Sequence, residues 1–287
     1  MPDASPLTED IANNESQRPA FSVLLSLYQN ERPEFFEECL QSVADQSWPP
    51  AEVVVVLDGP IGAELQSVID RWRERLPLVV LPLPQQEGLG RALAHGLQHC
   101  RHELVVRVDT DDFNQPWRFE RQVGFMARNP QIAVCGSCMW EVEPGTLQLL
   151  ARKVVPESDA SIRSMLPYRN PFNHPTVVLR RSCVLQAGNY RHCPQAEDYD
   201  LWLRLLAQGG KGWNLQDDLV LARAGTRMLR RRRGWNYVKT EYRLYRLKRQ
   251  LRVLGPLTAV LVFIARALPR LLPVSLLQPL YRVLRHS

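Results

Sequence analysis

Two short groups of acidic residues carry the side chains most suited to chemistry. The first group, Asp109-Thr-Asp111-Asp112, directly follows the apolar run Glu-Leu-Val-Val-Arg-Val. Carboxylates two or three positions apart on a turn can converge on one hard divalent cation and leave coordination positions for diphosphate oxygens. Such a cation stabilises the charge that develops on a departing diphosphate. The pattern therefore predicts a Mg²⁺ or Mn²⁺ site, and its main alternative is a solvated acidic turn.

The second group, Glu197-Asp198-Tyr-Asp200, opens an amphipathic stretch that runs from 196 to 208. Acids at the start of a helix complement its dipole and cap free amides, which gives these residues a structural interpretation. A carboxylate beside a second carboxylate can also have a raised pKa and accept a proton from a hydroxyl group. The residues alone leave both interpretations open.

The elements that precede these groups decide where they lie. Short apolar or β-branched runs predict strands, and the amphipathic stretches between them predict helices. The expected strands are 21–27, 52–57, 78–83 and 103–108, and the expected helices are 33–44, 61–75 and 90–99. This alternation predicts an α/β fold with a mostly parallel sheet. Ligands bind at the carboxyl ends of such strands, where Asp58 and Asp109 stand.

The regular alternation ends after Asp112. Further elements are expected as a helix at 117–128, strands at 132–140 and 176–179, and a helix at 196–208. Cys135 and Cys138 form a C-x-x-C pair. A zinc site would need a second pair of ligands, and a redox site would need a thioredoxin-like context. We therefore interpret the pair as part of a buried strand. The polar start of the chain, 1–18, lacks an apolar export signal, so reduced thiols are expected throughout.

Positive charge gathers at the end of the chain. Of its 36 Lys and Arg residues, 15 lie between 227 and 287 beside a single acid, Glu241. This segment begins with the arginines at 230–233 and includes the apolar run 254–265, which is shorter than the roughly 20 residues of a spanning helix. Bases, aromatic residues and apolar patches broken by proline predict helices that lie on an anionic membrane surface. Nucleic acid would not use the apolar run, so we expect no nucleic-acid partner, and packing on the main domain is the structural alternative.

These features divide the chain into a disordered leader (1–18), an α/β domain (19–226) and basic amphipathic, membrane-associating helices (227–287). Within the α/β domain, the order of six motifs resembles that of family 2 glycosyltransferases with the GT-A fold, an α/β/α sandwich. The motifs are Tyr28-Gln-Asn30-Glu31, Val-Val-Leu-Asp58-Gly, Glu87-Gly88-Leu-Gly90-Arg91, Asp109-Thr-Asp111-Asp112, Asn-Pro-Phe-Asn173-His174-Pro and Glu197-Asp198-Tyr-Asp-Leu-Trp202. The chain is most similar to the branch that builds bacterial capsule, exopolysaccharide and O-antigen, typified by the amylovoran biosynthesis transferases.

The resemblance implies that one set of residues holds a nucleotide sugar. The residues at the base and ribose would be Tyr28, Asn30 and Asp58, with Glu31 beside them. The residues that face the diphosphate and donor sugar would be Gly88, Gly90 and Arg91, because glycine permits close backbone approach and arginine pairs with anions. The family usually has Asp or Ser after the position of Asp58. This chain has Gly59-Pro60 there, which is a departure at the nucleotide contacts.

The resemblance also assigns the two acidic groups. Asp109 and Asp111 correspond to the D-x-D pair that holds Mn²⁺ or Mg²⁺. Asp109 would also contact the nucleotide sugar. Asp198 corresponds to the catalytic base, and Glu197 lies beside it. His174 is placed equally well as a diphosphate or metal contact and as a structural hydrogen-bonding residue. Trp202, at helical spacing, is expected in the core.

The implied activity is the transfer of a single sugar, with inversion, from a UDP-sugar to a lipid-linked or oligosaccharide acceptor at the cytoplasmic face of the inner membrane. Single transfer is expected because the Gln-x-x-Arg-Trp element of processive synthases is missing. A dehydrogenase is disfavoured because Gly88-x-Gly90 does not continue to G-x-G-x-x-G. A sugar nucleotidyltransferase would need a Gly-rich loop after the first strand. A catalytically silent, membrane-bound nucleotide-binding scaffold would not need the intact acids.

Overall fold

Four parallel strands form the first half of the sheet. The computed structural model describes residues 18–224 and 234–271, so nearly all of the predicted leader and the arginines at 230–233 lie outside the described residues. The strands are β1 (Phe21–Leu27), β2 (Glu52–Leu57), β3 (Leu78–Pro82) and β4 (Leu104–Arg107). They lie in the order β3-β2-β1-β4 with every pair parallel, as their apolar and β-branched sequences predict.

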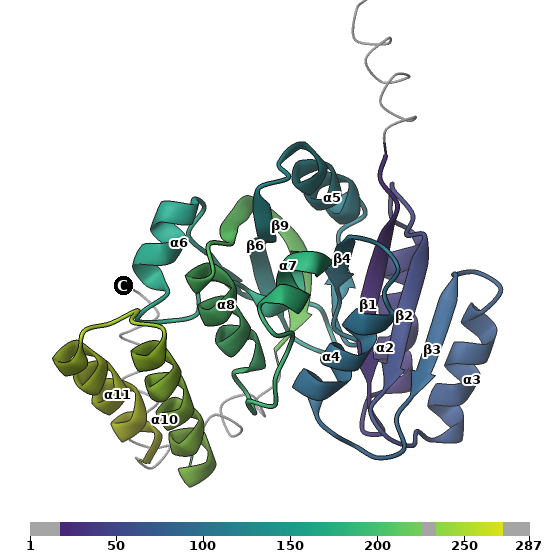
Figure 1. Cartoon of the computed structure of the whole chain (residues 1–287). Coiled ribbons are helices and arrows are strands. Elements are labelled where there is room, and N and C mark those ends of the chain that lie inside the picture. Colours follow the sequence, from purple (N-terminus) through teal and green to yellow (C-terminus); the bar gives the residue numbers. More distant parts are fainter. Residues whose placement is uncertain (1–17, 225–233, 272–287) are drawn as a thin grey trace, which may run out of the picture.

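Helices cover both faces of this sheet (Figure 1). One face carries α2 (Pro33–Ala44), α3 (Ala63–Trp72) and α5 (Arg118–Arg128), and the other carries α4 (Leu89–His99), α7 (Arg181–Gln186) and α8 (Glu197–Ala207). Successive residues of β1 point to opposite faces, so Val23 and Leu25 pack with α2 while Leu24 packs with α4. The α/β/α sandwich predicted from the sequence is therefore confirmed.

The second half of the sheet is mixed. Its strands are β5 (Phe113–Asn114), β6 (Ile132–Val142), β7 (Leu149–Lys153), β8 (Val178–Arg180) and β9 (Lys211–Arg223), and between them lie α6 (Asp159–Met165) and the 3-10 helix η1 (His174–Thr176). β8 is antiparallel to both β4 and β6, whereas β9 runs parallel to β6. The sequence did not predict β5, β7 or β9. The strand expected from 176 begins at 178, because η1 occupies the residues before it.

The cysteine pair lies inside the sheet. Cys135 and Cys138 stand in β6 with no exposed surface, which confirms their interpretation as part of a buried strand. All six cysteines are free thiols. Burial raises the pKa of the Cys135 thiol to about 12, so this thiol is protonated and unreactive at neutral pH.

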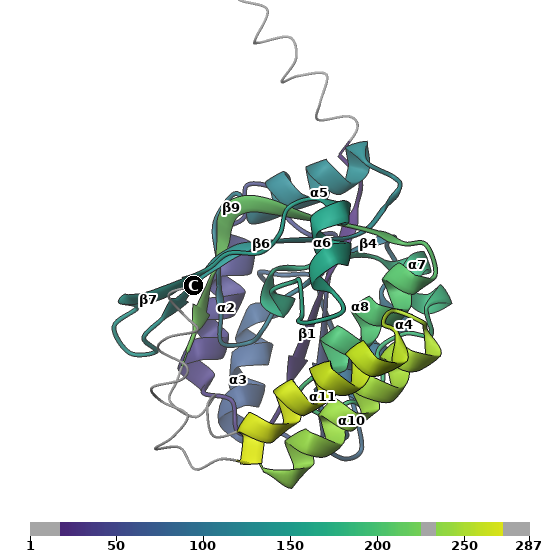
Figure 2. The ribbon, with the colours of Figure 1, turned by 90° about the vertical axis from the view of Figure 1, so that its left-hand side faces the viewer.

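A pair of helices follows the sheet. They are α10 (Trp235–Gln250) and α11 (Pro256–Leu271), and both lie within the segment predicted to form basic amphipathic helices. Figure 2 shows them side by side along one flank of the domain, with α10 next to α8. Leu244 of α10 is buried in the same core cluster as α8. None of the helices that the structure describes has both the length and the apolar character needed to cross a membrane.

Candidate active site

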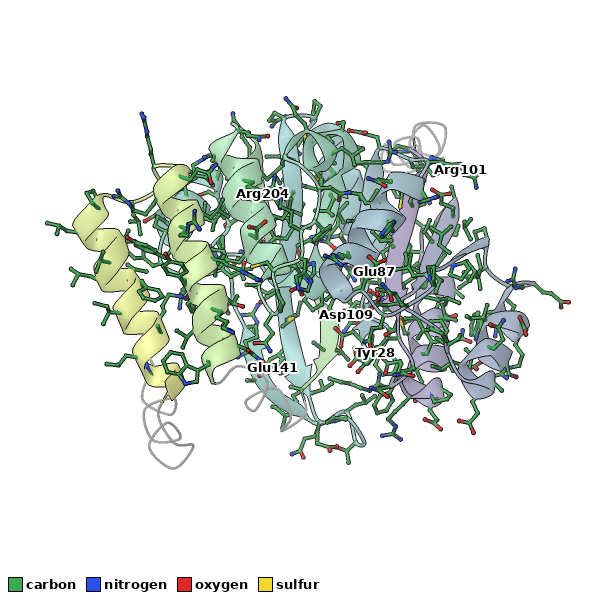
Figure 3. All side chains as sticks on the ribbon, turned by 60° about the horizontal axis from the view of Figure 1, so that its bottom comes forward. Tyr28, Glu87, Arg101, Asp109, Glu141 and Arg204 are labelled. Carbon is green, nitrogen blue, oxygen red and sulfur yellow. The ribbon has the colours of Figure 1, made fainter. Side chains whose placement is uncertain are left out.

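Three parallel strands bring the predicted site residues to one edge of the sheet. Tyr28 follows β1, Asp58 follows β2, and Asp109 stands two residues after β4. Figure 3 shows Tyr28, Glu87 and Asp109 on the same side of the molecule. Tyr28 is half-buried and Asn30 is exposed, so both have surface that a bound molecule could contact.

The Asp58 carboxylate is buried and already accepts hydrogen bonds. The backbone N–H of Glu87 donates to its Oδ1 at 2.6 Å, and the N–H of Gly88 lies 3.2 and 3.0 Å from its two oxygens. Gly88 has a φ of 90°, a conformation in which a side chain would be strained. Asp58 therefore fixes the loop before α4. A contact between Asp58 and a ribose stays a prediction, and it would have to use the remaining lone pairs.

Gly90 allows α4 to approach α8. A Cβ at this position would lie 2.5 Å from the carbonyl oxygen of Arg191 and 3.1 Å from the Cβ of Glu197. The sequence suggested that this glycine admits a ligand, whereas the close approach that the structure describes is to the protein's own backbone. The neighbouring Arg91 is exposed, so its guanidinium is accessible to an anion.

A buried arginine holds the first acidic group. Arg107, at the end of β4, is 1% exposed and donates to both carboxylate oxygens of Asp109. The Nε of Arg107 has no hydrogen-bond partner among the described residues. A buried donor without a partner is costly, so this N–H carries a desolvation penalty in the structure.

Asp111 and Asp112 differ in their surroundings. Asp112 is buried, and its Oδ1 accepts from a backbone N–H of β9 at 3.0 Å. Burial raises the pKa of Asp111 to about 7, and the nearby carboxylates of Asp109 and Glu31 add to the rise. Glu31 is tied to the same turn, because the Thr110 hydroxyl donates to it at 2.6 Å. The turn thus gathers several negative charges around Asp111.

A divalent cation fits the Asp111 side of this turn. It would relieve the repulsion between the Asp111 carboxylate and those of Asp109 and Glu31. Within residues 18–224 and 234–271, no three or more His, Cys, Asp or Glu side chains are arranged as a ready metal site. Asp109 would also have to share its carboxylate with Arg107. The protein alone therefore offers few metal ligands, and the diphosphate oxygens of a bound nucleotide sugar would have to supply the others.

His174 is placed as a hydrogen-bonding residue. Its Nε2 lies 3.1 Å from the Tyr190 hydroxyl, and its ring centroid lies 6.3 Å from that of Trp202. Burial lowers the pKa of His174 well below its usual value, aided by the charge of Arg107, so the imidazole is neutral. These contacts favour the structural interpretation, and a contact of His174 with metal or diphosphate stays a prediction.

The second acidic group starts α8. Oδ2 of Asp198 accepts from the side-chain amide of Asn170, and Oδ1 accepts from the next backbone N–H at 2.7 Å. Burial raises the pKa of Glu197 to about 7, and the charge of Asp198 adds to the rise. Asp200 instead forms an ion pair with Arg204 at 2.6 Å, which gives Asp200 a structural role.

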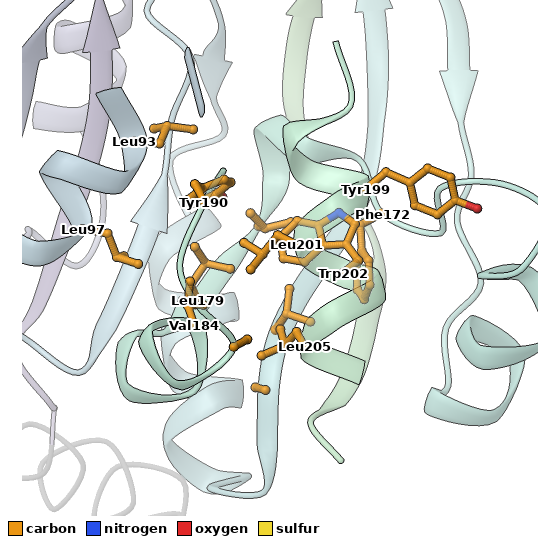
Figure 4. Close-up of a cluster of buried hydrophobic side chains, with 14 of the residues drawn as sticks. Leu93, Leu97, Phe172, Leu179, Val184, Tyr190, Tyr199, Leu201, Trp202 and Leu205 are labelled. Carbon is orange, nitrogen blue, oxygen red and sulfur yellow. The ribbon is translucent and has the colours of Figure 1, made fainter. Parts of the chain in front are cut away.

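Core packing fixes the direction of α8. Figure 4 shows the cluster of buried apolar side chains between α4 and α8. Trp202 is fully buried there, with its ring centroid 5.2 Å from that of Phe172, so its predicted place in the core is confirmed. Because this apolar face is anchored, the acids of the first turn are held at the edge of the sheet.

The two acidic groups lie close enough to interact. The charges of Arg107 and Asp109 both act on the Glu197 carboxyl group. The sequence analysis missed Arg107 and Asn170, which contact the two acidic groups. Arg107 had a signal, since a charged residue inside the apolar run 103–108 needs a buried partner. Asn170 had no signal, because nothing local indicates that it contacts α8.

Relatives of known sequence share most of the chain. Residues 22–186 match the model of glycosyl transferase family 2. The chain is 44% identical over 261 residues to the amylovoran biosynthesis glycosyltransferase AmsE of Erwinia amylovora, which covers 91% of this chain and 97% of that protein. It is 37% identical over 270 residues to the UDP-Gal:alpha-D-GlcNAc-diphosphoundecaprenol beta-1,3-galactosyltransferase of Escherichia coli, with coverages of 92% and 96%.

Solved structures share the fold. The mannosyltransferase PcManGT from Pyrobaculum calidifontis, in complex with GDP-Man and Mn²⁺, matches 94% of this chain and 81% of its own with a TM-score of 0.61 at 19% identity. S. aureus TarS 1-349, in complex with UDP-GlcNAc, matches 88% of this chain and 72% of its own with a TM-score of 0.61 at 20% identity. The chain therefore has the GT-A fold and belongs to glycosyl transferase family 2.

Proposed function

We propose that the chain is an inverting glycosyltransferase that moves one sugar from a UDP-sugar to a lipid-linked saccharide during synthesis of a bacterial surface polysaccharide. The observation that supports this most is the meeting of two differently held acidic groups at one edge of the sheet. A UDP donor is supported by the galactosyltransferase relative and by the neighbour with UDP-GlcNAc. The diphosphoundecaprenol in the name of that relative supports a lipid-linked acceptor.

In this reaction Asp198 takes the proton of the acceptor hydroxyl group. The acceptor oxygen bonds to the anomeric carbon while the bond from that carbon to the diphosphate breaks, so UDP leaves from the opposite side and the configuration inverts. Asp111, with Asp109, would hold Mn²⁺ or Mg²⁺, which would offset the charge on the diphosphate. The exposed guanidinium of Arg91 would donate to the same anion.

A thermal-shift screen of nucleotide sugars tests the donor. Because a ligand that binds only the native state stabilises it, about 2.7 kcal/mol is expected at a hundred times the Kd. We expect UDP-sugars to raise the melting temperature in Mn²⁺, and GDP-sugars to have a smaller effect. Release of UDP upon addition of a GlcNAc-diphospholipid would then show transfer. Stabilisation without any turnover or hydrolysis would instead support the silent scaffold, and release of pyrophosphate from UTP would support a nucleotidyltransferase.

We further propose that α11 rests on an anionic membrane at the cytoplasmic face of the inner membrane. Five aliphatic side chains share one face of this helix and are 40% to 81% exposed: Leu257, Val260, Leu261, Ile264 and Leu268. The neighbouring α10 exposes the bases Lys239, Arg243, Arg246 and Arg249. An apolar face beside bases suits the boundary between acyl chains and anionic headgroups. The arginines at 230–233 lie outside the described residues.

Flotation with liposomes that contain anionic phospholipid tests this surface. Ile264→Glu and Leu268→Glu should each lower the bound fraction several-fold, because both place a charge in the apolar face. Leu150→Glu is the matched control, since Leu150 is 53% exposed on β7, away from this helix. Equal binding by all three variants, or no binding by the unaltered protein, would reject α11 as the membrane contact.

A further inference from the structure

The pair of helices α10 and α11, called here the C-terminal hairpin, packs against the segments that hold Asp198. Leu244 of α10 is 2% exposed within the core cluster around α8. The Thr240 hydroxyl donates at 3.1 Å to the carbonyl oxygen of Pro194, which lies just before α8. Figure 2 shows both helices along this flank. The hairpin is therefore packed onto the folded domain rather than attached loosely to it.

Arg266 of α11 joins three parts of the molecule. Its Nε and Nη2 donate to the two carboxylate oxygens of Glu241 in α10, each at 2.8 Å, and its Nη1 donates to the carbonyl oxygen of Tyr168 at 3.0 Å. Glu241 is 3% exposed. Loss of one partner of such an ion pair leaves a buried charge uncompensated. Arg266 therefore holds α10, α11 and the loop at residue 168 in one arrangement.

This loop leads directly to Asp198. Two residues after Tyr168, the side-chain amide of Asn170 donates to Oδ2 of Asp198. The Oδ1 of Asn170 accepts from the backbone N–H of Phe172 at 3.1 Å, which fixes the direction in which the amide points. The segment 168–170 thus connects the guanidinium of α11 to a side chain that orients the carboxylate.

A second contact passes through Tyr199, the residue after Asp198. Its hydroxyl donates to the carbonyl oxygen of Leu166 at 2.6 Å. The Lys248 Nζ lies 4.8 Å from the centroid of its ring, and the Arg266 guanidinium lies 5.8 Å from it. Both helices of the hairpin therefore contact the first turn of α8.

We propose that the C-terminal hairpin positions the catalytic base: Arg266, through the segment 168–170 and the amide of Asn170, holds Asp198 in the orientation that proton transfer requires. This inference rests on the proposed function, in which Asp198 is the base. Arg266 and Asn170 are positioning residues, because they act through Asp198. The hairpin thus has a role in turnover that is separate from its outer apolar face.

Steady-state kinetics of the full-length protein test the inference. Arg266→Met should lower kcat about tenfold and leave the KM for the UDP-sugar unchanged, because a displacement of about 1 Å can cost up to about 10²-fold in rate. Asn170→Ala should have the same effect. Arg163→Met is the matched control, since Arg163 pairs with Asp159 and donates to the carbonyl of Leu206 at the other end of α8. This control should lower the melting temperature and leave kcat unchanged.

A double variant separates positioning from general destabilisation. Arg266→Met should reduce the rate of Asp198→Asn no further, because its effect passes through that carboxylate. If Arg266→Met does not fold, Arg266→Lys replaces it: it keeps a charge beside Glu241 but is too short to reach Tyr168 as well, so the same loss of kcat is expected. Unchanged kcat in a folded Arg266 variant, or full additivity with Asp198→Asn, overturns the inference alone. A fully active Asp198→Asn instead overturns the proposed base.

Discussion

The acidic group after β4 and the acidic group at the start of α8 are held in opposite ways. After β4, Arg107 binds both oxygens of Asp109, and a backbone N–H of β9 binds Asp112. At α8, the neutral amide of Asn170 binds Asp198, and burial raises the pKa of the adjacent Glu197 to about 7. Asp109 therefore has a charged partner in Arg107, whereas Asp198 accepts from the neutral amide of Asn170.

This difference indicates different chemistry for two similar strings of acids. A carboxylate that accepts hydrogen bonds from arginine at both oxygens is fixed in place by charge-assisted contacts, which suits a position beside an ion or a diphosphate. At the start of α8, burial raises the pKa of Glu197 to about 7 beside the Asp198 carboxylate, which suits proton transfer near neutral pH. The partners of each carboxylate, more than the spacing of the acids, therefore decide its role.

The largest effect is expected at the second group. Asp198→Asn should lower turnover by about 10²–10⁴-fold, which is the contribution of a positioned base, and should leave the affinity for the UDP-sugar unchanged. Initial rates and donor titrations measure both quantities. Glu197→Gln is the comparison variant and should retain more activity. If Glu197→Gln is inactive while Asp198→Asn turns over normally, the roles of the two carboxylates are reversed.

A loss of about 10²–10³-fold, the range seen when one group that stabilises developing charge is removed, is expected from Asp111→Asn. In contrast to Asp198→Asn, this variant should also weaken binding of the UDP-sugar in Mn²⁺. Its melting temperature without ligand should not fall, because the substitution removes a half-buried carboxylate that Asp109 and Glu31 repel. Full activity of the unaltered protein in EDTA would show that this group does not work through a metal.

Gly90→Ala tests whether the second group can be disturbed without the first. The added methyl would meet the carbonyl of Arg191 at 2.5 Å and force the start of α8 outward, at a cost of about 1–3 kcal/mol in stability. We expect a several-fold lower kcat with Mn²⁺-dependent UDP binding retained, as measured by calorimetry. Gly145→Ala is the control, because a Cβ there meets no atom closer than 3.5 Å. An equal loss of kcat in both variants would contradict the close packing of α4 against α8.

The smallest effect concerns stability and pH. The pKa of Glu197 is raised to about 7 by burial and by Asp198, so the folded protein holds this proton more tightly than the unfolded chain does. The stabilisation that Glu197 provides is complete at pH below its usual pKa and is lost as the pH rises toward 7. Glu197→Gln should therefore gain stability relative to the unaltered protein between pH 5 and pH 8 in urea titrations. If the free energies of unfolding of Glu197→Gln and of the unaltered protein differ by the same amount at every pH, Glu197 is not held in its protonated form.

The sequence predicts the first half of the sheet well because each strand there is a short, mostly apolar or β-branched run. β9 escapes prediction because its buried and exposed positions follow a long curved path beside β6, with Asp217 and Asp218 in its middle and irregular pairing. The acids of the site were recognisable from their place at strand and helix ends. Their partners were not, since the contact of Asn170 with Asp198 joins residues 28 positions apart and depends on the tertiary fold.

The pairing of Asp112 with β9 also bears on how the protein is made. The N–H that binds Asp112 belongs to Arg223, a residue 111 positions further along the chain. At about 5–20 residues per second, a ribosome needs on the order of 10 s to cover that distance. The parallel strands β1 to β4 can therefore assemble while β9 is still being synthesised. The nascent chain would pass through a stage in which the parallel strands exist but Asp112 lacks its hydrogen bond from Arg223, so the acidic turn would be completed late in synthesis.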